Sequence, residues 1–161
     1  MQTSREVAHE TTEQPAIIRF YSVSDDYGEF SNFSPHPIRL DGQLWPSSEH
    51  YFQAQKFEDA KQRQRIRGVK SPAEAARLGR DRKQRLRRDW ESVKVQVMHK
   101  AVVAKFTQHP ELRELLLSTN QARIVEHTEN DAYWGDGGDG SGRNMLGQIL
   151  MRVRAALQGS E

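Results

Sequence analysis

The pattern of apolar and polar residues predicts a few short strands in a chain that is otherwise mostly helical. Residues 17–21 form a β-branched and aromatic run. Residues 38–45 have the same character on both sides of Asp41-Gly42, a pair typical of two-residue hairpin turns. One more strand is predicted at residues 122–126. The strands are too few to dominate the fold.

Helices are predicted over most of the chain after the hairpin. Ser47 or Ser48 can cap a helix that continues to about residue 58. The capping box at residues 71–74 opens a helix that Gly79 can end. Apolar residues that recur with the helical period predict three more helices, at residues 93–106, 111–118 and 146–157.

The predicted fold class is therefore mainly α with a few short β-strands (α+β). For a chain of 161 residues we expect a single compact domain over residues 16–158, after a disordered N-terminal tail at residues 1–15. The sequence has no cysteine, which excludes a disulfide framework and any Cys-based metal site or nucleophile. No apolar span is long enough to cross a bilayer, so we expect a cytoplasmic protein without a membrane partner.

The charge is unevenly distributed along the chain. Residues 56–105 carry 16 Lys and Arg against 6 Asp and Glu, although the net charge of the whole chain is only +2. A basic segment between acidic ends favours one face that attracts phosphate. The simpler interpretation is that runs such as residues 80–88 are solvated faces of helices and loops, and we favour it for most of these charges.

The first candidate site lies in residues 45–57. Glu49, Gln53 and Lys56 are spaced at i, i+4 and i+7, so they share one face of the predicted helix. The helical rise places Glu49 and Lys56 roughly 10 Å apart, a length comparable to a ribose with its phosphate. In the alternative interpretation, Glu49 only interacts with the helix dipole and Lys56 is solvated.

The second candidate site is a loop with five glycines that precedes the last predicted helix. Its backbone amides can cradle an anion, but its two aspartates would repel a phosphate unless Arg143 offsets them. We interpret the loop as a flexible lid that carries Asp131, Trp134 and Asp136 to a ligand, with Tyr133 or Trp134 stacking on a base. The alternative is an ordinary surface loop. No spacing of histidines and carboxylates supports a metal site.

An ordered set of motifs runs from about residue 17 to residue 157. It includes Phe30-Ser31-Asn32-Phe33, Trp45-Pro46-Ser47-Ser48-Glu49 with its continuation to Phe57, Trp90-Glu91, Lys105-Phe106, Val125-Glu126-x-Thr128-x-x-Asp131-x-x-Trp134-Gly135 and Gly142-x-Asn144-x-Leu146-Gly147. This set resembles the NADAR family, and within it the YbiA-like N-glycosidases. So many separated matches in order are far more specific than any one motif.

The resemblance implies the hydrolysis of a C1′–N glycosidic bond in a small-molecule substrate. YbiA-like members are associated with cleaving ribosylaminopyrimidine 5-phosphate intermediates of riboflavin biosynthesis, which clears reactive metabolites. Related NADAR proteins are associated with removing ADP-ribose from guanine bases, so nucleic acid is expected only as a modified substrate. The motifs leave both branches open, and neither branch implies a cofactor or a metal.

Breaking a C1′–N bond develops positive charge on the sugar and negative charge on the departing base. We expect Glu49 near C1′ as a stabiliser or base, and Asp131 or Asp136 as the second carboxylate. Lys56 either binds phosphate or sugar hydroxyls, or forms a Schiff base with the ring-opened aldehyde. The remaining candidates are expected to bind the substrate by stacking, hydrogen bonding or phosphate contact: Trp90, Trp134, Phe33, Asn32, Asn144, Arg80 and Arg82.

Two functions of other classes are the alternatives to an N-glycosidase. One is a non-catalytic binder of ADP-ribose or nucleotides, and the other is a nucleic-acid-binding module built on the basic middle of the chain. Glu49 and the acidic loop argue against both, because a protein that only reads phosphate gains nothing from carboxylates beside its ligand. The sequence leaves the oligomeric state open.

Overall fold

The computed structural model describes residues 16–160, so the tail expected at residues 1–15 lies outside the described residues. In chain order the elements are β1 (Ile17–Phe20), the 3-10 helix η1 (Gly28–Phe30), β2 (Ile38–Leu40), β3 (Gln43–Trp45), α1 (Ser48–Ala54), α2 (Ala60–Gly68), α3 (Pro72–Gly79), α4 (Trp90–Gln108), α5 (Pro110–Ser118), β4 (Arg123–Glu126) and α6 (Met145–Gly159).

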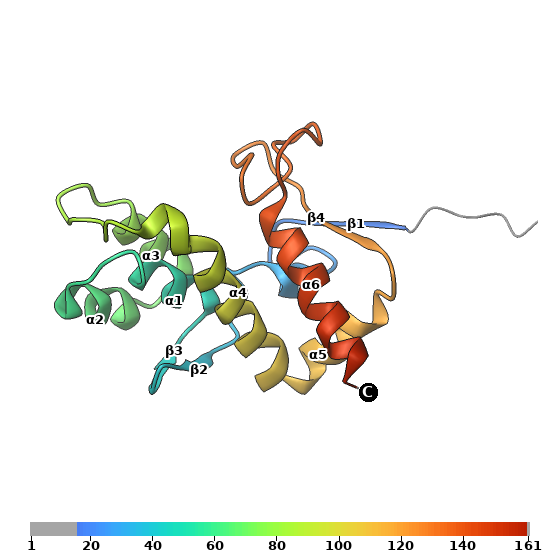
Figure 1. The fold of residues 1–161 in the computed structure, drawn as a ribbon, viewed down its shortest axis with the longest axis horizontal. Helices are drawn as coiled ribbons and strands as arrows, with labels where there is room; N and C mark the ends of the chain where they lie inside the picture. The colour runs from blue at the N-terminus through green and yellow to red at the C-terminus, as the bar shows by residue number, and fades with distance from the viewer. Residues whose placement is uncertain (1–15, 161) are drawn as a thin grey trace, which may run out of the picture.

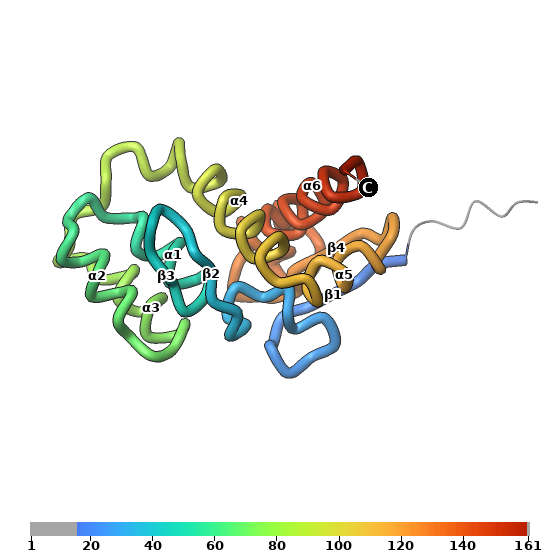
Figure 2. The backbone as a smooth tube through the Cα atoms, turned by 90° about the horizontal axis from the view of Figure 1, so that it is seen from below, coloured from blue at the N-terminus to red at the C-terminus, as the bar shows by residue number. Residues whose placement is uncertain are grey.

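Helix α4 runs through the middle of the molecule and separates two groups of elements (Figure 1). The first group is α1, α2 and α3 with the β2–β3 hairpin, and the second is α5 and α6 with the strands β1 and β4. The view turned by 90° shows the same division (Figure 2). Helix α4 contacts α1 and β2 in the first group, and α5 and α6 in the second. It therefore holds the two groups together.

The strands form two separate two-stranded sheets. β1 pairs with β4 in parallel, and β2 pairs with β3 in an antiparallel hairpin. The turn residues of the hairpin, Asp41 and Gly42, have φ angles of 53° and 78°. Two consecutive positive φ angles are what a type I′ turn requires, which is why this pair favours a hairpin. The mainly helical α+β fold predicted from the sequence is confirmed.

Helix α1 begins where the sequence predicts but ends earlier. The Ser47 hydroxyl accepts a hydrogen bond from the backbone N–H of His50 and so caps the helix. The helix ends at Ala54, not near residue 58, and the chain turns so that Phe57 is only 1% exposed. Lys56 therefore lies in the turn after α1, and the prediction that it occupies a helical face with Glu49 is wrong.

Two apolar clusters meet along α4. The first is built around Phe30, Phe106 and Ile124, and the second around Trp45 and Phe57. Helix α4 serves both, with the residues Met98, Val102 and Phe106 in the first cluster and Ala101 and Ala104 in the second. Because one helix lines both clusters, packing in each fixes how the two groups of elements face each other.

Candidate active site

A pocket of about 630 Å³ lies where the two groups of elements meet. This volume is in the range of pockets that bind small molecules. Seven of the residues proposed from the sequence line it: Asn32, Phe33, Glu49, Lys56, Arg80, Asp131 and Trp134. The first helical region and the loop after β4, far apart in sequence, therefore form one site.

Glu49 lies in the first turn of α1 with its side chain in the pocket wall. It is 8% exposed, and the side-chain amide of Gln53 donates a hydrogen bond of 2.7 Å to its Oε1 atom. Burial raises the pKa of Glu49, whereas the hydrogen bond from Gln53 and the charges of Lys56 and Arg80 lower it. Glu49 is thus a desolvated carboxyl group with the cations Lys56 and Arg80 nearby.

Asn32 is held beside Glu49 by the start of the same helix. The Ser48 hydroxyl donates to Asn32 Oδ1 at 2.9 Å, and the backbone N–H of Glu49 donates to the Asn32 carbonyl. The Asn32 amide nitrogen lies 3.2 Å from the sulfur of Met98. The neighbouring Phe33 is 42% exposed, which leaves an aromatic ring at the pocket edge.

Lys56 extends into the pocket from the turn after α1. Its Nζ atom lies 5.7 Å from the centre of the Phe52 ring. Burial lowers the pKa of Lys56 and the charge of Glu49 raises it, while Arg80 and Lys94 lower it further. Within residues 16–160 no carboxylate lies within salt-bridge distance of this amine. A lowered pKa gives Lys56 a larger fraction of neutral amine than a solvated lysine has.

Glu126, at the end of β4, is a pocket residue that the sequence reasoning did not assign to the site. Its Oε2 atom is buried and has no hydrogen-bond partner among the described residues. Burial, followed by the charges of Asp131, Glu49 and Asp136, raises the pKa of Glu126 to about 7. Its place in a motif beside Val125 was visible, but a strand residue gives no sign of which way it faces.

Asn144 positions β4 and does not line the pocket. Its side-chain oxygen accepts from the backbone N–H of Glu126 at 2.9 Å, and its amide donates to the carbonyl of Ile124 at 2.9 Å. The side chain thus replaces a neighbouring strand beside β4. The expected contact between Asn144 and the substrate is not supported by this position.

The glycine-rich loop is tied together by its own carboxylates. Both oxygens of Asp136 accept hydrogen bonds or pair within the loop: Oδ1 accepts from the backbone of Thr128 and Gly138, and Oδ2 lies 2.7 Å from His127 Nδ1. Asp131 Oδ1 accepts from two backbone N–H groups, and this residue does line the pocket. Asp136 does not line it. In this structure the segment predicted as a flexible lid is held in place by these hydrogen bonds, and part of it forms the pocket wall.

The two tryptophans that were candidates for the site, Trp90 and Trp134, have different positions. Trp134 lines the pocket, and its ring lies 5.3 Å from Phe52 at an angle of 84°. Trp90 is 7% exposed and packs behind Phe52 at 5.1 Å, inside the core. Only Trp134 is placed to touch a ligand directly. The two candidate arginines also differ in position: Arg80 lines the pocket, whereas Arg82 is exposed outside it.

The family of the chain follows from comparison with known proteins. A model of the NADAR domain matches residues 19–158. The chain belongs to the NADAR family. The resemblance seen in the sequence motifs is therefore confirmed.

Similar NADAR proteins carry names of N-glycosidases and riboflavin biosynthesis proteins. The chain is 65% identical over 144 residues to the N-glycosidase YbiA of Escherichia coli (strain K12), covering 89% of this chain and 90% of that protein. It is 43% identical over 159 residues to the chloroplastic riboflavin biosynthesis protein PYRR of Zea mays, covering 89% of this chain and 26% of the maize protein. The NMR structure of E. coli YbiA matches with a TM-score of 0.85 at 64% sequence identity, covering 91% of this chain and 88% of that one.

The described part of this NADAR chain contains no group of three or more potential metal-ligating side chains. None of its described helices is long and apolar enough to span a membrane. The cytoplasmic location and the independence from metal stay predictions. What the site offers chemically is a set of acidic groups, two cations and aromatic rings around one cavity.

Proposed function

We propose that this NADAR protein is an N-glycosidase that hydrolyses the C1′–N bond of a ribosylaminopyrimidine 5-phosphate intermediate of riboflavin biosynthesis. The observation that carries the proposal is a single pocket in which Glu49 and Asp131 share a cavity with Lys56 and Arg80. The reaction needs acidic groups beside a sugar and cations beside a phosphate. Relatives named N-glycosidase and riboflavin biosynthesis protein support the same reaction and the same pathway.

The pocket suggests how such a substrate is held. Arg80 is exposed at the pocket edge, where a guanidinium can bind a phosphate that remains partly solvated. Trp134 and Phe33 offer rings on which the pyrimidine can stack. The Asn32 side chain, fixed by Ser48, supplies a polar contact for the base or the ribose.

Glu49 carries the charge that the bond cleavage requires. As the C1′–N bond breaks, the sugar acquires positive charge, and a desolvated carboxylate stabilises that charge more strongly than a solvated one does. Burial raises the pKa of Glu49, and the hydrogen bond from Gln53 together with the charges of Lys56 and Arg80 opposes this rise. We therefore assign Glu49 to C1′, with Asp131 as the further carboxylate of the pocket.

Lys56 has two roles that fit its position. A neutral amine beside C1′ forms a Schiff base with the ring-opened sugar, and the lowered pKa of Lys56 favours this role. A charged Lys56 instead binds the phosphate or sugar hydroxyls. We favour the Schiff base, because Arg80 already provides a cation for the phosphate.

Four of the site residues predicted from the sequence do not contact the substrate in this proposal. Asp136 braces the loop, Asn144 holds β4, and Trp90 supports Phe52 from behind. Arg82 is exposed outside the pocket, and we assign it no contact with the substrate.

The test is to incubate the protein with the ribosylaminopyrimidine 5-phosphate and, separately, with guanine carrying ADP-ribose, and to follow the release of base by chromatography. We expect release from the pyrimidine substrate. Release only from ADP-ribosylated guanine would move the protein to the other NADAR reaction. Binding of either compound without release would support a non-catalytic binder.

A further inference from the structure

The two glutamates that line the pocket, the buried Glu49 and the partly buried Glu126, differ in their hydrogen-bond partners. Glu49 has a hydrogen-bond donor at 2.7 Å and the charges of two cations, all of which favour its ionised form. The buried Oε2 atom of Glu126 has no donor among the described residues. A buried carboxylate without a donor is costly, and a protonated carboxyl group avoids this cost. Burial raises the pKa of both groups, and they differ in their partners, because Glu49 has a hydrogen-bond donor whereas Glu126 Oε2 has none among the described residues.

The charged surroundings of Glu126 come from several elements. The acidic groups that act on it are Glu49 from α1 and Asp131 and Asp136 from the loop after β4. Lys56 and Arg80 line the same pocket but are not among the groups that shift Glu126. The titratable and charged groups contributed by the packed strand β1 and helix α6 are the exposed Arg19 and Arg152, and Arg154, whose guanidinium is bound to Thr119 and Ala122.

We propose that Glu126 is the general acid of the reaction and donates the proton that the departing nitrogen needs. This inference rests on the proposed N-glycosidase function. Its geometric basis is a carboxyl group in the same cavity as Glu49, on a different element, with an oxygen that has no hydrogen-bond partner within residues 16–160. The pKa of about 7 keeps a large fraction of this group protonated at neutral pH.

The electron pair of the C1′–N bond moves to nitrogen, and the proton of Glu126 forms the new N–H bond of the released aminopyrimidine. In the net reaction the oxygen of water binds C1′ and keeps one hydrogen, while Glu49 takes the second proton. Exchange with solvent then reprotonates Glu126 and deprotonates Glu49. A covalent intermediate on Lys56 changes the order of events at C1′ but not the proton given to nitrogen.

The experiment compares wild type, Glu126→Gln and Glu126→Asp over pH 5 to 9 with the ribosylaminopyrimidine 5-phosphate. For wild type we expect kcat/KM to fall as the pH rises past about 7, because the acid loses its proton. Glu126→Gln should lower kcat by about a hundredfold with little change in KM, and should abolish this decline. Glu126→Asp keeps a proton donor, so it should retain a declining profile at a reduced rate.

Circular dichroism and thermal melting of both variants check that they fold. A Glu126→Gln enzyme within about threefold of wild type, or one that keeps the decline above pH 7, overturns the assignment of Glu126 while leaving the N-glycosidase function intact. A wild-type protein that releases no base from this substrate overturns the proposed function and the acid step together. The two failures are therefore distinguishable.

Discussion

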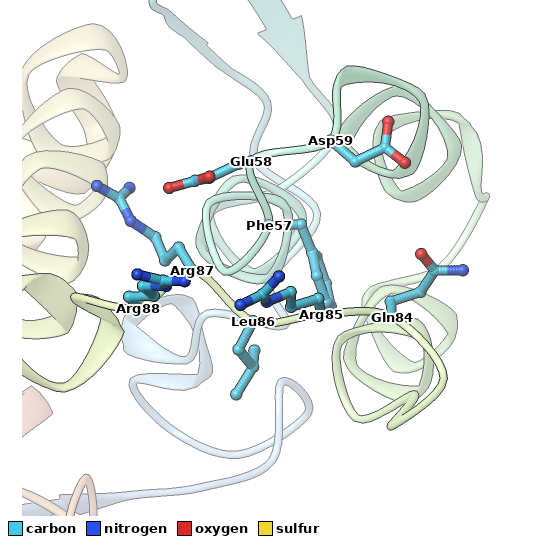
Figure 3. A pocket seen from close by; sticks show the side chains of 8 residues that line it. All are labelled: Phe57, Glu58, Asp59, Gln84, Arg85, Leu86, Arg87 and Arg88. Carbon is cyan, nitrogen blue, oxygen red and sulfur yellow. The ribbon is translucent and has the colours of Figure 1, made fainter.

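Two hollows in the molecular surface contain arginines and carboxylates, but they differ in how far those charges are removed from water. The pocket around Glu49 has a volume of about 630 Å³, and a second cleft of about 430 Å³ lies between the turn after α1 and residues 84–88. Figure 3 shows the side chains of this second cleft around Phe57. Its Glu58, Arg85 and Arg88 are exposed.

The difference lies in desolvation and not in the kinds of charged residue. In the second cleft Arg87 forms a bidentate pair with Asp89, with N–O distances of 2.6 and 3.0 Å, and solvent screens the rest. In the pocket, burial raises the pKa of both Glu49 and Glu126. Acid and base catalysis depends on such pKa shifts. We therefore expect the reaction to take place in the pocket, and the residues of the second cleft to be dispensable for catalysis.

The largest effect is expected from the buried carboxylate at the centre of the comparison. Glu49→Gln retains the shape of the side chain but removes the charge that stabilises the cationic sugar, so kcat should fall by more than about a hundredfold. Glu58→Gln, in the second cleft, is the matched control and should leave kcat unchanged. Steady-state kinetics of the two variants tests this. Near wild-type activity of Glu49→Gln would favour a simple helix-dipole role.

The second expected effect is on stability. Because burial raises the pKa of Glu126 to about 7, its protonated form is favoured in the folded state. The contribution of Glu126 to the free energy of unfolding is fully present below the ordinary carboxyl pKa of 4.5 and is lost as the pH rises through about 7. Over this pH window we expect the free energy of unfolding of wild type to fall by roughly 2 kcal/mol relative to that of Glu126→Gln.

Urea unfolding of both proteins at pH 4.5 and pH 8 measures this difference. Glu58→Gln again serves as the control, since an exposed carboxylate should give no such change between the two pH values. Parallel curves for wild type and Glu126→Gln would mean that the Glu126 carboxyl is not buried in the way the structure shows.

Lys56 is expected to give the next largest effect. If its amine forms a Schiff base with the opened sugar, Lys56→Arg should lower kcat more than tenfold, because arginine keeps the charge but is not a nucleophilic amine. Borohydride added during turnover should trap a protein–sugar adduct that maps to this residue. The exposed Lys61 provides the control as Lys61→Arg. No adduct together with an active Lys56→Arg enzyme would favour direct attack by water.

The sequence predicted most elements and about two thirds of the proposed site. The helical period of apolar residues, the capping residues and the Asp41-Gly42 turn are local signals. They located the hairpin and the principal helices. Helix α2 was not anticipated, because only Gln62 and Ile66 of its residues are buried and its face is mostly charged. A weak apolar stripe gives little helical periodicity to detect.

The errors within the site come from contacts that are distant in sequence. Glu126 faces the pocket only because β4 pairs with β1 and Asn144 holds its other edge. Asp136 was expected to reach the ligand, but its oxygens are used by Thr128, Gly138 and His127 inside the loop. Residue type alone does not tell whether a carboxyl group binds the ligand or holds a loop together. Only the tertiary structure distinguishes the hydrogen-bonded Asp136 from Glu126, whose Oε2 atom has no partner among the described residues.

A smaller effect should follow from changing the support of Glu49. A Cβ atom at Gly79 would lie 1.8 Å from Gln53 Oε1, so Gly79→Ala should displace the amide that hydrogen-bonds to Glu49. We expect kcat to fall about fivefold, comparable to the loss of one hydrogen bond. Gly68→Ala is the control, because its Cβ would meet nothing within 4 Å. Equal kinetics of the two variants would show that Gln53 does not orient Glu49.

The smallest effect tests the second cleft directly. Replacing Arg85 and Arg88 together by glutamine removes two exposed charges that do not line the pocket, so kcat/KM should stay within about twofold of wild type at moderate salt. Arg80→Gln removes a charge only five positions before Arg85 in the sequence, but this charge belongs to the pocket. It should raise KM about tenfold through the lost phosphate contact, with little change in kcat. Equal losses from both changes would mean that the basic segment attracts the substrate as a whole, and that the phosphate is not bound at one site.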